Sequence, residues 1–456
     1  MKKIVIKFGG SNLRTKEDVA RIIKVISGCQ TAVVIVISAL YGVTDALLKT
    51  IRQAPGDREV IRRIKRSLMA AHLRIATLYI DKPEHKKTVV KKIKDRVNTL
   101  EKYLLGIHYL GEAPDFVRDL VLSYGERLSS LLLTSILNSR GLTCEEVLPE
   151  QLGLVTNGEY GNAEVDFAAA EKNLKEYLSG PKRYIVPGFY GISPNCRVTL
   201  LGRGGSDYSA AAIGRCIGAA SVDLWKDVDG FMSADPGIVK NPVSINSLTY
   251  REAAELSYFG AQILHPRTFE PLMDKKIPLR LFNIKNFSGK GEPLTIINNK
   301  LVIKEDVVKS VTFSDDFGIL KLTGPGVGIK PGIMAKVTTR LHEGNINIKS
   351  IITAQTSINI LLAREDLPKS YRLVKEMGLP TVEQVSDLDH ISLIAVVGEG
   401  MLDRPGIAAR VFGAVSRHKV NILIISAGAS SVATYFIIER KDREKTIRSI
   451  HEEFFG

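Results

Sequence analysis

The feature that most limits the fold is a series of short, largely apolar runs that alternate with helical patterns. The run "KIVIKF" (residues 3–8) leads through the glycine turn "GGSNLR" into a helical pattern from Lys16, where Thr15 and Asp18 have capping-box spacing. A second apolar run, "TAVVIVIS" (31–38), follows. Strands without polar alternation are typical of parallel sheets covered on both faces. The sequence therefore predicts an α/β fold with a mostly parallel sheet sandwiched by helices.

The same alternation continues to about residue 300. We expect further strands at 183–192, 220–230 and 277–284, and helices at about 58–104, 115–140, 166–178 and 207–218. These elements predict one α/β domain over residues 1–300.

An internal repeat begins after the turn-rich stretch 286–295. "GPGVGIKPGIMAKVTTRLHEGNINIKSI", from Gly324, aligns without a gap with "GEGMLDRPGIAARVFGAVSRHKVNILII", from Gly398. Each copy predicts a strand, a glycine loop, a helix that starts at "PGI" and a strand led by "N-I". We therefore predict two small α+β modules, over 306–385 and 386–456.

Composition excludes several classes of protein. The chain has 456 residues, 45% of them hydrophobic, and no apolar run approaches the roughly 18 residues of a membrane span. The N-terminus lacks the long apolar segment of a signal peptide, so we expect a cytoplasmic protein without a membrane partner. The four cysteines are far apart and form no C-x-x-C pair, which favours free thiols over a zinc site or disulfides.

The formal charge of +14 raises the question of nucleic-acid binding. Much of the excess lies in "RRIKRS" (62–67) and "KKTVVKKIKDR" (86–96), which we place in one helical stretch with aliphatic residues at helical spacing. No aromatic-rich or zinc-type binding motif accompanies them. We therefore interpret the charge as a solvated helix face and expect no nucleic-acid partner.

Two glycine-rich turns are candidate anion sites. In "KFGG", Lys7 brings a cation beside the open backbone of Gly9 and Gly10, which suits phosphate, although a plain strand-to-helix turn has the same pattern. In "LGRGGSDYSAAAIG" (201–214), Arg203 can grip a carboxylate, and Ser206 with the loop amides can bind an oxyanion. Asp207 caps that helix, or orders a lysine or a magnesium ion.

Three further stretches carry polar groups at strand ends or in apolar helices. Glu126, in "SYGERLSSLLL", either accepts a substrate ammonium or forms an internal ion pair with Arg127 or a lysine. Ser38 and Thr44 follow the second strand, where ligands bind in open α/β sheets. The loop "WKDVDGFMSADPGI" (225–238) has three aspartates and is suited to holding a nucleotide.

Together these pieces resemble the aspartate kinases of the amino-acid kinase family, over almost the whole chain. "KFGGS", "GRGGSDYSA", "DVDGFMSADP" and "ELSYFGAQILHPRT" (255–268) stand in the order of that family's signatures, and the C-terminal repeat resembles its paired ACT modules. The resemblance implies an amino-acid kinase fold over 1–300 and ferredoxin-like ACT modules over 306–385 and 386–456. It also implies transfer of a phosphoryl group from ATP to the β-carboxylate of L-aspartate, towards lysine, threonine and methionine.

The resemblance assigns roles to individual residues. Lys7 and Asp207 would be catalytic, with Asp207 orienting Lys7 and the phosphates. The expected cofactors are ATP and Mg²⁺, and no metal site formed by protein side chains is expected. The expected aspartate ligands are Ser38, Thr44, Glu126, Arg203 and Ser206. The expected nucleotide contacts are Lys7, Gly9, Gly10, Ser11, Lys226, Asp227, Met232, Asp235 and Gln262.

The chain departs from many relatives around the expected ATP site, at Lys226, Met232, Gly237 and Gln262. Two alternatives stay open: another amino-acid kinase, such as glutamate 5-kinase or acetylglutamate kinase, or a catalytically inactive amino-acid sensor.

For the modules we expect a homodimer or a dimer of dimers with an amino-acid effector at the ACT interface. Lys349 stands where lysine-sensitive relatives tend to have an acidic residue, so we expect threonine or no effector rather than lysine. The expected effector residues are Gly332, Ile333, Asn347, Ile348 and Asn421.

Overall fold

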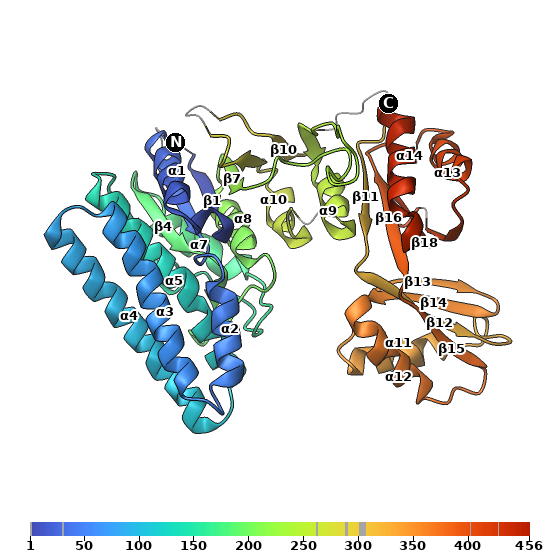
Figure 1. Ribbon diagram of the computed structural model, residues 1–456, viewed down its shortest axis with the longest axis horizontal. Coiled ribbons are helices and arrows are strands. Elements are labelled where there is room, and N and C mark those ends of the chain that lie inside the picture. The colour runs from blue at the N-terminus through green and yellow to red at the C-terminus, as the bar shows by residue number, and fades with distance from the viewer. Residues whose placement is uncertain are drawn as a thin grey trace. The chain divides into compact units, whose positions relative to one another are not determined.

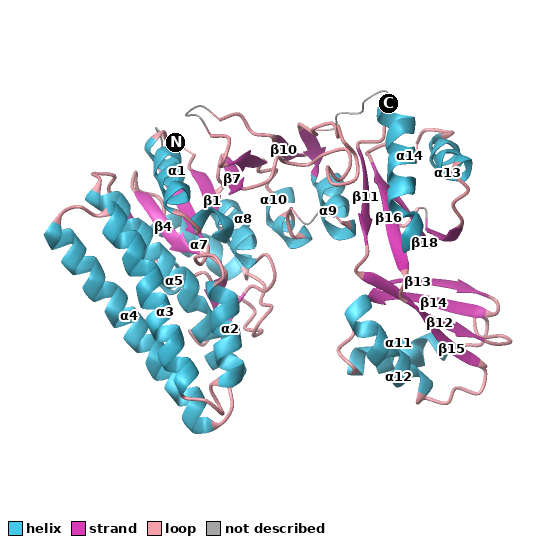
Figure 2. Ribbon diagram, in the orientation of Figure 1, coloured by secondary structure: helices cyan, strands magenta, loops and turns pink. Residues whose placement is uncertain are grey.

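The chain forms two compact units in the computed structural model (Figures 1 and 2). The structure describes residues 2–29, 32–260, 263–287, 291–300, 307–401, 403–426 and 428–456. The first unit comprises residues 1–231, 244–257 and 262–302, and the second comprises 232–243, 258–261 and 303–456.

The first unit is built on an eight-stranded sheet with the order β3-β4-β2-β1-β7-β9-β10-β8. All neighbouring strands run parallel except β9 and β10, which confirms the predicted mostly parallel sheet. The strands are β1 (Ile4–Phe8), β2 (Val33–Ile37), β3 (Cys144–Glu146), β4 (Arg183–Pro187), β7 (Ser221–Lys226), β8 (Ser247–Thr249), β9 (Leu279–Asn283) and β10 (Thr295–Asn298). A separate hairpin consists of β5 (Tyr190–Ile192) and β6 (Val198–Leu200).

Helices cover both faces of this sheet. Ile6 and Phe8 belong to a core cluster shared with the helical bundle, whereas Gly214 packs its helix closely on Val5 and Val222, which point to the other face. The helices are η1 (Gly10–Leu13), α1 (Lys16–Ser27), α2 (Val43–Gln53), α3 (Glu59–Tyr79), α4 (Pro83–Leu110), α5 (Asp115–Ser139), α6 (Pro149–Leu152), α7 (Phe167–Tyr177), α8 (Gly205–Ile217), α9 (Tyr250–Phe259), η2 (Pro266–Thr268) and α10 (Glu270–Met273). The helix α5 is apolar and long enough to cross a membrane, but 83% of its most apolar window is buried in the protein.

Local sequence patterns predicted most of these elements, and the start of α1 is an example. Thr15 Oγ1 accepts a hydrogen bond from Asp18 N, and Asp18 Oδ2 accepts one from Thr15 N, so the predicted capping box is confirmed.

Two predicted continuous elements are broken. The single helix expected over 58–104 is wrong, because α3 ends at Tyr79 and α4 begins at Pro83, which lacks an amide hydrogen and holds Lys82 extended. The strand expected over 183–192 is likewise split between β4 and β5, where Phe189 adopts a φ of 76°.

The second unit contains two modules with the same layout. The first module has the order β13-β14-β12-β15, and the second has the order β11-β16-β18-β17, so both match a ferredoxin-like α+β fold. The predicted alignment of the repeat relates β12 (Phe317–Thr323) to β16 (Ile391–Val397), and α11 (Ile333–Glu343) to α13 (Ile407–Arg417). The remaining elements are β11 (Ser310–Ser314), β13 (Ile348–Ala354), β14 (Ser357–Ala363), η3 (Arg364–Asp366), α12 (Leu367–Lys375), β15 (Gln384–Leu388), β17 (Ile422–Ser426), β18 (Ala433–Glu439), η4 (Arg440–Asp442) and α14 (Arg443–Phe455).

Strand pairing corrects the predicted boundaries. The first module is a complete βαββαβ unit that ends with β15, beyond the expected limit at residue 385. The second module ends with α14 and takes its fourth strand from β11, which precedes the first module and pairs antiparallel with β16. The first module is thus inserted between β11 and β16. Residues 232–243, expected in the first domain, also belong to the second unit, because Ala234 and Ile238 are buried in its core.

This topology makes a prediction about isolated fragments. Residues 315–390 contain every strand of the first module and should melt cooperatively, whereas residues 390–456 lack β11, which leaves the edge of β16 and its apolar core exposed. We expect a fragment over 307–456, which restores β11 but not residues 232–243, to melt more cooperatively in circular dichroism than residues 390–456. Cooperative melting of residues 390–456 alone would contradict the strand exchange.

Candidate active site

A cavity of about 360 Å³ in the first unit collects the residues expected to bind the substrate. Its walls come from β1, the loop after β2, α5, and the loop that leads into α8. The lining residues are Lys7, Gly10, Ser38, Ala39, Leu40, Tyr41, Gly42, Thr44, Asp45, Glu126, Phe189, Gly202, Arg203, Gly204, Gly205, Ser206 and Asp207. The fold therefore brings widely separated parts of the sequence to one place.

Lys7 and Asp207 form a buried ion pair at this cavity. Lys7 shares the sheet face of Val5, which α8 covers, and Asp207 lies in the first turn of α8. The Lys7 ammonium lies 2.5 Å from Asp207 Oδ1, and both side chains are less than one-tenth exposed. Burial lowers the pKa of Lys7, and the Asp207 carboxylate opposes that change. Burial would raise the pKa of Asp207, but nearby ammonium groups hold it well below its usual value.

A second lysine binds the same carboxylate. Lys226 Nζ donates to Asp207 Oδ2 at 2.9 Å, so each oxygen of Asp207 contacts one lysine. Because Lys7 pairs with Leu224 across the parallel strands β1 and β7, Lys226 points to the same face of the sheet as Lys7. Of the roles left open for Asp207, a helix cap or the ordering of a lysine or a magnesium ion, the structure shows the ordering of lysines.

The glycine turn after β1 is fastened to the end of β7. Ser11 Oγ donates to Asp227 Oδ1 at 3.0 Å, and Asn12 Nδ2 donates to the carbonyl of Trp225 at 2.6 Å. A Cβ at Gly10 would lie only 2.9 Å from the carbonyl oxygen of Ala39, so only glycine fits here without movement. The turn thereby approaches the loop after β2 with its backbone and the end of β7 with its side chains.

Glu126 presents an unsatisfied oxygen to the cavity. Its Oε1 accepts from Ala39 N at 3.1 Å, whereas Oε2 is buried and has no hydrogen-bond partner among the residues that the structure describes. This approach depends on Gly125, because a Cβ there would meet Ala39 Cβ at 2.7 Å. Burial raises the pKa of Glu126 to about 8, although the Ala39 amide and Lys7 oppose the rise.

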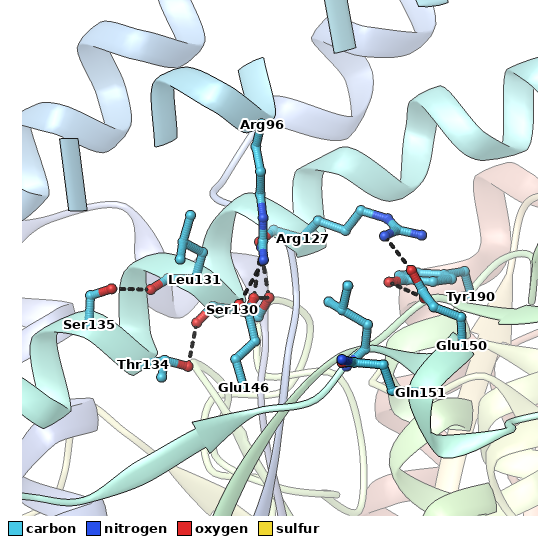
Figure 3. Close-up of polar contacts among 11 residues, drawn as sticks. Arg96, Arg127, Ser130, Leu131, Thr134, Ser135, Glu146, Glu150, Gln151 and Tyr190 are labelled. Atoms are coloured by element: carbon cyan, nitrogen blue, oxygen red, sulfur yellow. Dashed lines mark hydrogen bonds and ion pairs between the residues drawn. The ribbon is translucent and has the colours of Figure 1, made fainter. Parts of the chain in front are cut away.

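The alternative of an ion pair between Glu126 and Arg127 is wrong. Arg127 points the other way and donates to Glu150 at 2.7 Å (Figure 3). On the same helix, Ser130 donates to Glu146, which also receives two hydrogen bonds of 2.7 Å from Arg96. These pairs fix α5 against α4 and β3, and so fix the direction of Glu126.

The loop before α8 is held in place by hydrogen bonds to Asp119 and by a close contact at Gly204. Asp119 Oδ2 accepts from Gly161 N at 2.7 Å and from Leu200 N at 2.8 Å, which anchors the start of the loop. Gly204 has a φ of 72° and packs on His265, so the turn requires glycine. Arg203 is exposed at the cavity wall and joins no ion pair within the described part of the chain.

The other expected site residues lie elsewhere. Gly9, Ser11, Lys226 and Asp227 are in the first unit but do not line the cavity. Met232 and Asp235 belong to the second unit, where the carbonyl of Met232 accepts from Ser310 Oγ. Gln262 lies outside the described residues. In the modules, α11 and α13 begin at Ile333 and Ile407, as predicted, after Gly332 and Gly406 in the left-handed conformation. Asn347 and Asn421 are exposed, and Ile348 begins β13.

Sequence reasoning missed several contributors. Ala39 supplies the amide that orients Glu126, and Tyr41 lines the cavity while Arg14 stacks 3.4 Å from the centre of its ring. Asp119 acts through the loop amides. Asp119 could have been found from the sequence, because it is a charged residue in the apolar helix α5. The role of Ala39 could not, because its backbone amide would be the same with any other side chain.

Glu126 should make stability depend on pH. Since burial raises its pKa from about 4.5 to about 8, the stabilising neutral form is complete below the lower value and is lost as pH rises through the upper one. Glu126→Gln cannot ionise, so its melting temperature without ligands should gain on wild type by about 2 °C or more between about pH 5 and about pH 8.5. A difference that does not change with pH would mean that Glu126 is ionised throughout. Glu101→Gln, at the partly exposed Lys65–Glu101 pair on α4, is the control.

Comparisons with known proteins identify the family and the fold. Residues 2–283 match the amino acid kinase family, and residues 394–454 match the ACT domain. Over all of both chains, the fold superimposes on E. coli aspartokinase III in complex with aspartate and ADP with a TM-score of 0.83 at 25% identity. The complex of the same enzyme with lysine and aspartate gives 0.81 at 26% identity.

Curated relatives lead to the same family. The chain is 30% identical to chloroplastic Aspartokinase 1 of Arabidopsis thaliana, with 99% of this chain and 80% of that protein covered. It is 29% identical to the bifunctional aspartokinase/homoserine dehydrogenase of Buchnera aphidicola, of which it covers 56%. The chain spans about half the length of such bifunctional relatives. On these matches, the chain belongs to the aspartokinase branch of the amino acid kinase family and carries a C-terminal ACT domain.

Proposed function

We propose that the protein transfers the γ-phosphoryl group of ATP to the β-carboxylate of L-aspartate, which yields 4-phospho-L-aspartate and ADP. The observation that carries this proposal is the convergence of Lys7, Asp207, Arg203 and the unpaired oxygen of Glu126 on one cavity. The aspartokinase relatives, and the aspartate and ADP bound to E. coli aspartokinase III, support it.

In this proposal the cavity recognises an amino acid with two carboxylates. The substrate ammonium pairs with Glu126 Oε2, which ionises as it gains this partner. Arg203 is free to turn its planar guanidinium onto a carboxylate, and Ser38, Thr44 and Ser206 bind the remaining oxygens. The α8 N-terminus adds backbone amides next to Ser206.

The transfer itself requires position and charge rather than a general base. The β-carboxylate is already ionised at neutral pH and attacks the γ-phosphorus, while the bond from phosphorus to the bridging oxygen breaks and its electrons leave with ADP. Lys7 stabilises charge on the transferring group, and Gly9 and Gly10 donate backbone amides in place of a Walker loop. Asp207 holds Lys7 and Lys226 at a fixed spacing.

In this proposal the nucleotide binds at the end of β7 and at the glycine turn after β1. Ser11, Lys226 and Asp227 lie there, and Met232, Asp235 and Gln262 stay predictions for this role. Within the described ranges, no three His, Cys, Asp or Glu side chains form a group that could cage a metal. Mg²⁺ would therefore be held mainly by phosphates and water, with Asp227 as the nearby carboxylate, and would neutralise phosphate charge. The cytoplasmic location stays a prediction.

The role of Lys7 can be tested by Lys7→Ala. We expect kcat to fall about 100-fold or more while the aspartate KM changes little, because the lysine meets the phosphoryl group mainly in the transition state. Turnover is measured by ADP release and by hydroxylamine trapping of aspartyl phosphate. Lys49→Ala, at an exposed position on α2, is the control. Near-normal turnover of Lys7→Ala would refute the assignment. Wild-type turnover with glutamate instead of aspartate would favour glutamate 5-kinase, and no turnover would favour the inactive sensor.

We also propose that the protein is a homodimer or a dimer of dimers that responds to an amino acid at the modules. Among the described residues, β13 and β17 end their sheets and pair with a strand on one side only, which leaves an edge for pairing with another chain. The α11 N-terminus and Asn347 would receive the carboxylate and polar groups of the effector. Lys349, whose ammonium lies 5.0 Å from the centre of the Tyr258 ring, places a positive charge on β13 that disfavours lysine.

We therefore expect threonine, rather than lysine, to inhibit if any amino acid does. Asn347→Ala should raise the threonine concentration for half inhibition several-fold, whereas Asn421→Ala, the equivalent change in the other repeat, tests which copy is used. Activity titrations at millimolar amino acid decide the matter. Strong inhibition by lysine would refute the charge argument, and no response would leave the modules a structural role.

A further inference from the structure

The nucleotide loop, Lys226–Phe231, continues directly into a segment that belongs to the other unit. We call Met232–Val243 the docking segment. It leaves the first unit at Phe231, and the chain returns at Ser244. The exit and return are closed by Ile245 N, which donates to the carbonyl of Phe231 at 2.8 Å. Across the base of the segment, Ser233 N donates to the carbonyl of Val243 at 2.8 Å.

The docking segment is an integral part of the second module. The β11 strand donates to it twice, from Ser310 Oγ to the carbonyl of Met232 and from Val311 N to the carbonyl of Ser233, both at 2.8 Å. Arg448 on α14 donates to the carbonyl of Ile238 at 3.0 Å. Ala234 and Ile238 are buried in the same apolar core as Val311 and the buried face of α14. The segment is thus held by backbone hydrogen bonds and by burial.

One buried side-chain contact also joins the docking segment to α14. Ser233 Oγ lies 2.8 Å from His451 Nε2, and both residues are more than nine-tenths buried. Since Ser233 Oγ already accepts from Val243 N at 2.8 Å, its own hydrogen is available for the imidazole. With His451 neutral, a state that burial favours by lowering its pKa, Nε2 can accept that hydrogen. The ring also stacks on Phe455, 4.7 Å between centres.

The nucleotide loop is short enough to transmit any movement of this anchor. Only Phe231 and Met232 separate Gly230 from Ser233, so the chain between them can span at most about 11 Å. On its other side the loop is tied within the first unit, because Asp229 Oδ1 accepts from Asn283 at 2.6 Å and from Asn286 at 3.1 Å. The loop is therefore fixed at both ends, and one end depends on the second module.

We propose that Ser233 and His451 are a positioning pair through which the second module fixes the nucleotide loop and so sets the affinity for a nucleoside di- or triphosphate. This inference rests on the proposed function, since it assumes that the loop binds the nucleotide. His451 touches neither substrate nor nucleotide and acts only through Ser233. The C-terminal helix is thereby part of the nucleotide site's framework, although it lies at the far end of the sequence.

His451→Phe tests the pair in the full-length protein. Phenylalanine keeps a ring for Phe455 but removes the acceptor, so we expect the dissociation constant for ADP and the KM for ATP to rise about two- to tenfold, as loss of one neutral hydrogen bond allows. The kcat at saturating ATP and the aspartate KM should stay near wild type. His451→Gln retains an acceptor and should recover most of the nucleotide affinity.

Binding can be measured without turnover, because Trp225 is the only tryptophan and adjoins Lys226. ADP titrations followed by its fluorescence report on the loop directly. Ile450→Val is the matched control, since Ile450 is buried in the same core on α14 but is not part of the Ser233 contact. Chemical denaturation gives the free energy of unfolding of each variant, so that changes in ADP affinity can be compared at known stability.

The expected result is weaker ADP binding in His451→Phe, with Ile450→Val and His451→Gln near wild type. Unchanged affinity in His451→Phe, or equal weakening in Ile450→Val, would overturn the positioning role, because the effect would then be absent or merely one of stability. Failure of the wild-type protein to bind ADP would overturn the proposed function and this inference with it.

Discussion

The architecture of the site depends on a single buried carboxylate. Asp207 binds two ammonium groups, Lys7 and Lys226, which arrive from adjacent parallel strands. Removing three charges from water is costly, and the cost is offset only when each charged group has a close partner. One oxygen for each lysine meets that condition, and the α8 N-terminus further favours the negative charge. One positive charge is left over, and a phosphate chain would balance it.

The positions of these charges follow from close backbone contacts rather than from long side chains. Gly10 approaches the carbonyl oxygen of Ala39, after β2, and Gly125 approaches its Cβ, both at distances that exclude a Cβ on the glycine. The same closeness brings the Ala39 amide to Glu126. Gly188 likewise leaves room for Ser206, which a Cβ would approach within 2.9 Å. Small residues at the strand ends and in α5 thus allow the close contacts around the cavity.

The sequence predicted what is encoded locally. The apolar runs located β1 and β2, and the gap-free repeat predicted the helix starts at Ile333 and Ile407. For the site, motif resemblance selected five substrate ligands, and all five line one cavity with Lys7. The prediction failed where one residue overrides periodicity, as Pro83 does, and where pairing is non-local. Nothing within residues 306–316 indicates that β11 pairs with β16, because antiparallel pairing depends on which edge is open after folding.

That non-local pairing has a consequence for cooperativity. The second module cannot complete its sheet without β11, and its core also contains Ala234 and Ile238 of the docking segment. Both contributions come from chain that precedes the first module, so the second module forms only after much of the preceding sequence is in place. The docking segment of this module continues within a few residues into Asp229 and Lys226, so the stretch for which we propose nucleotide binding and the core of the second module lie on one continuous length of backbone.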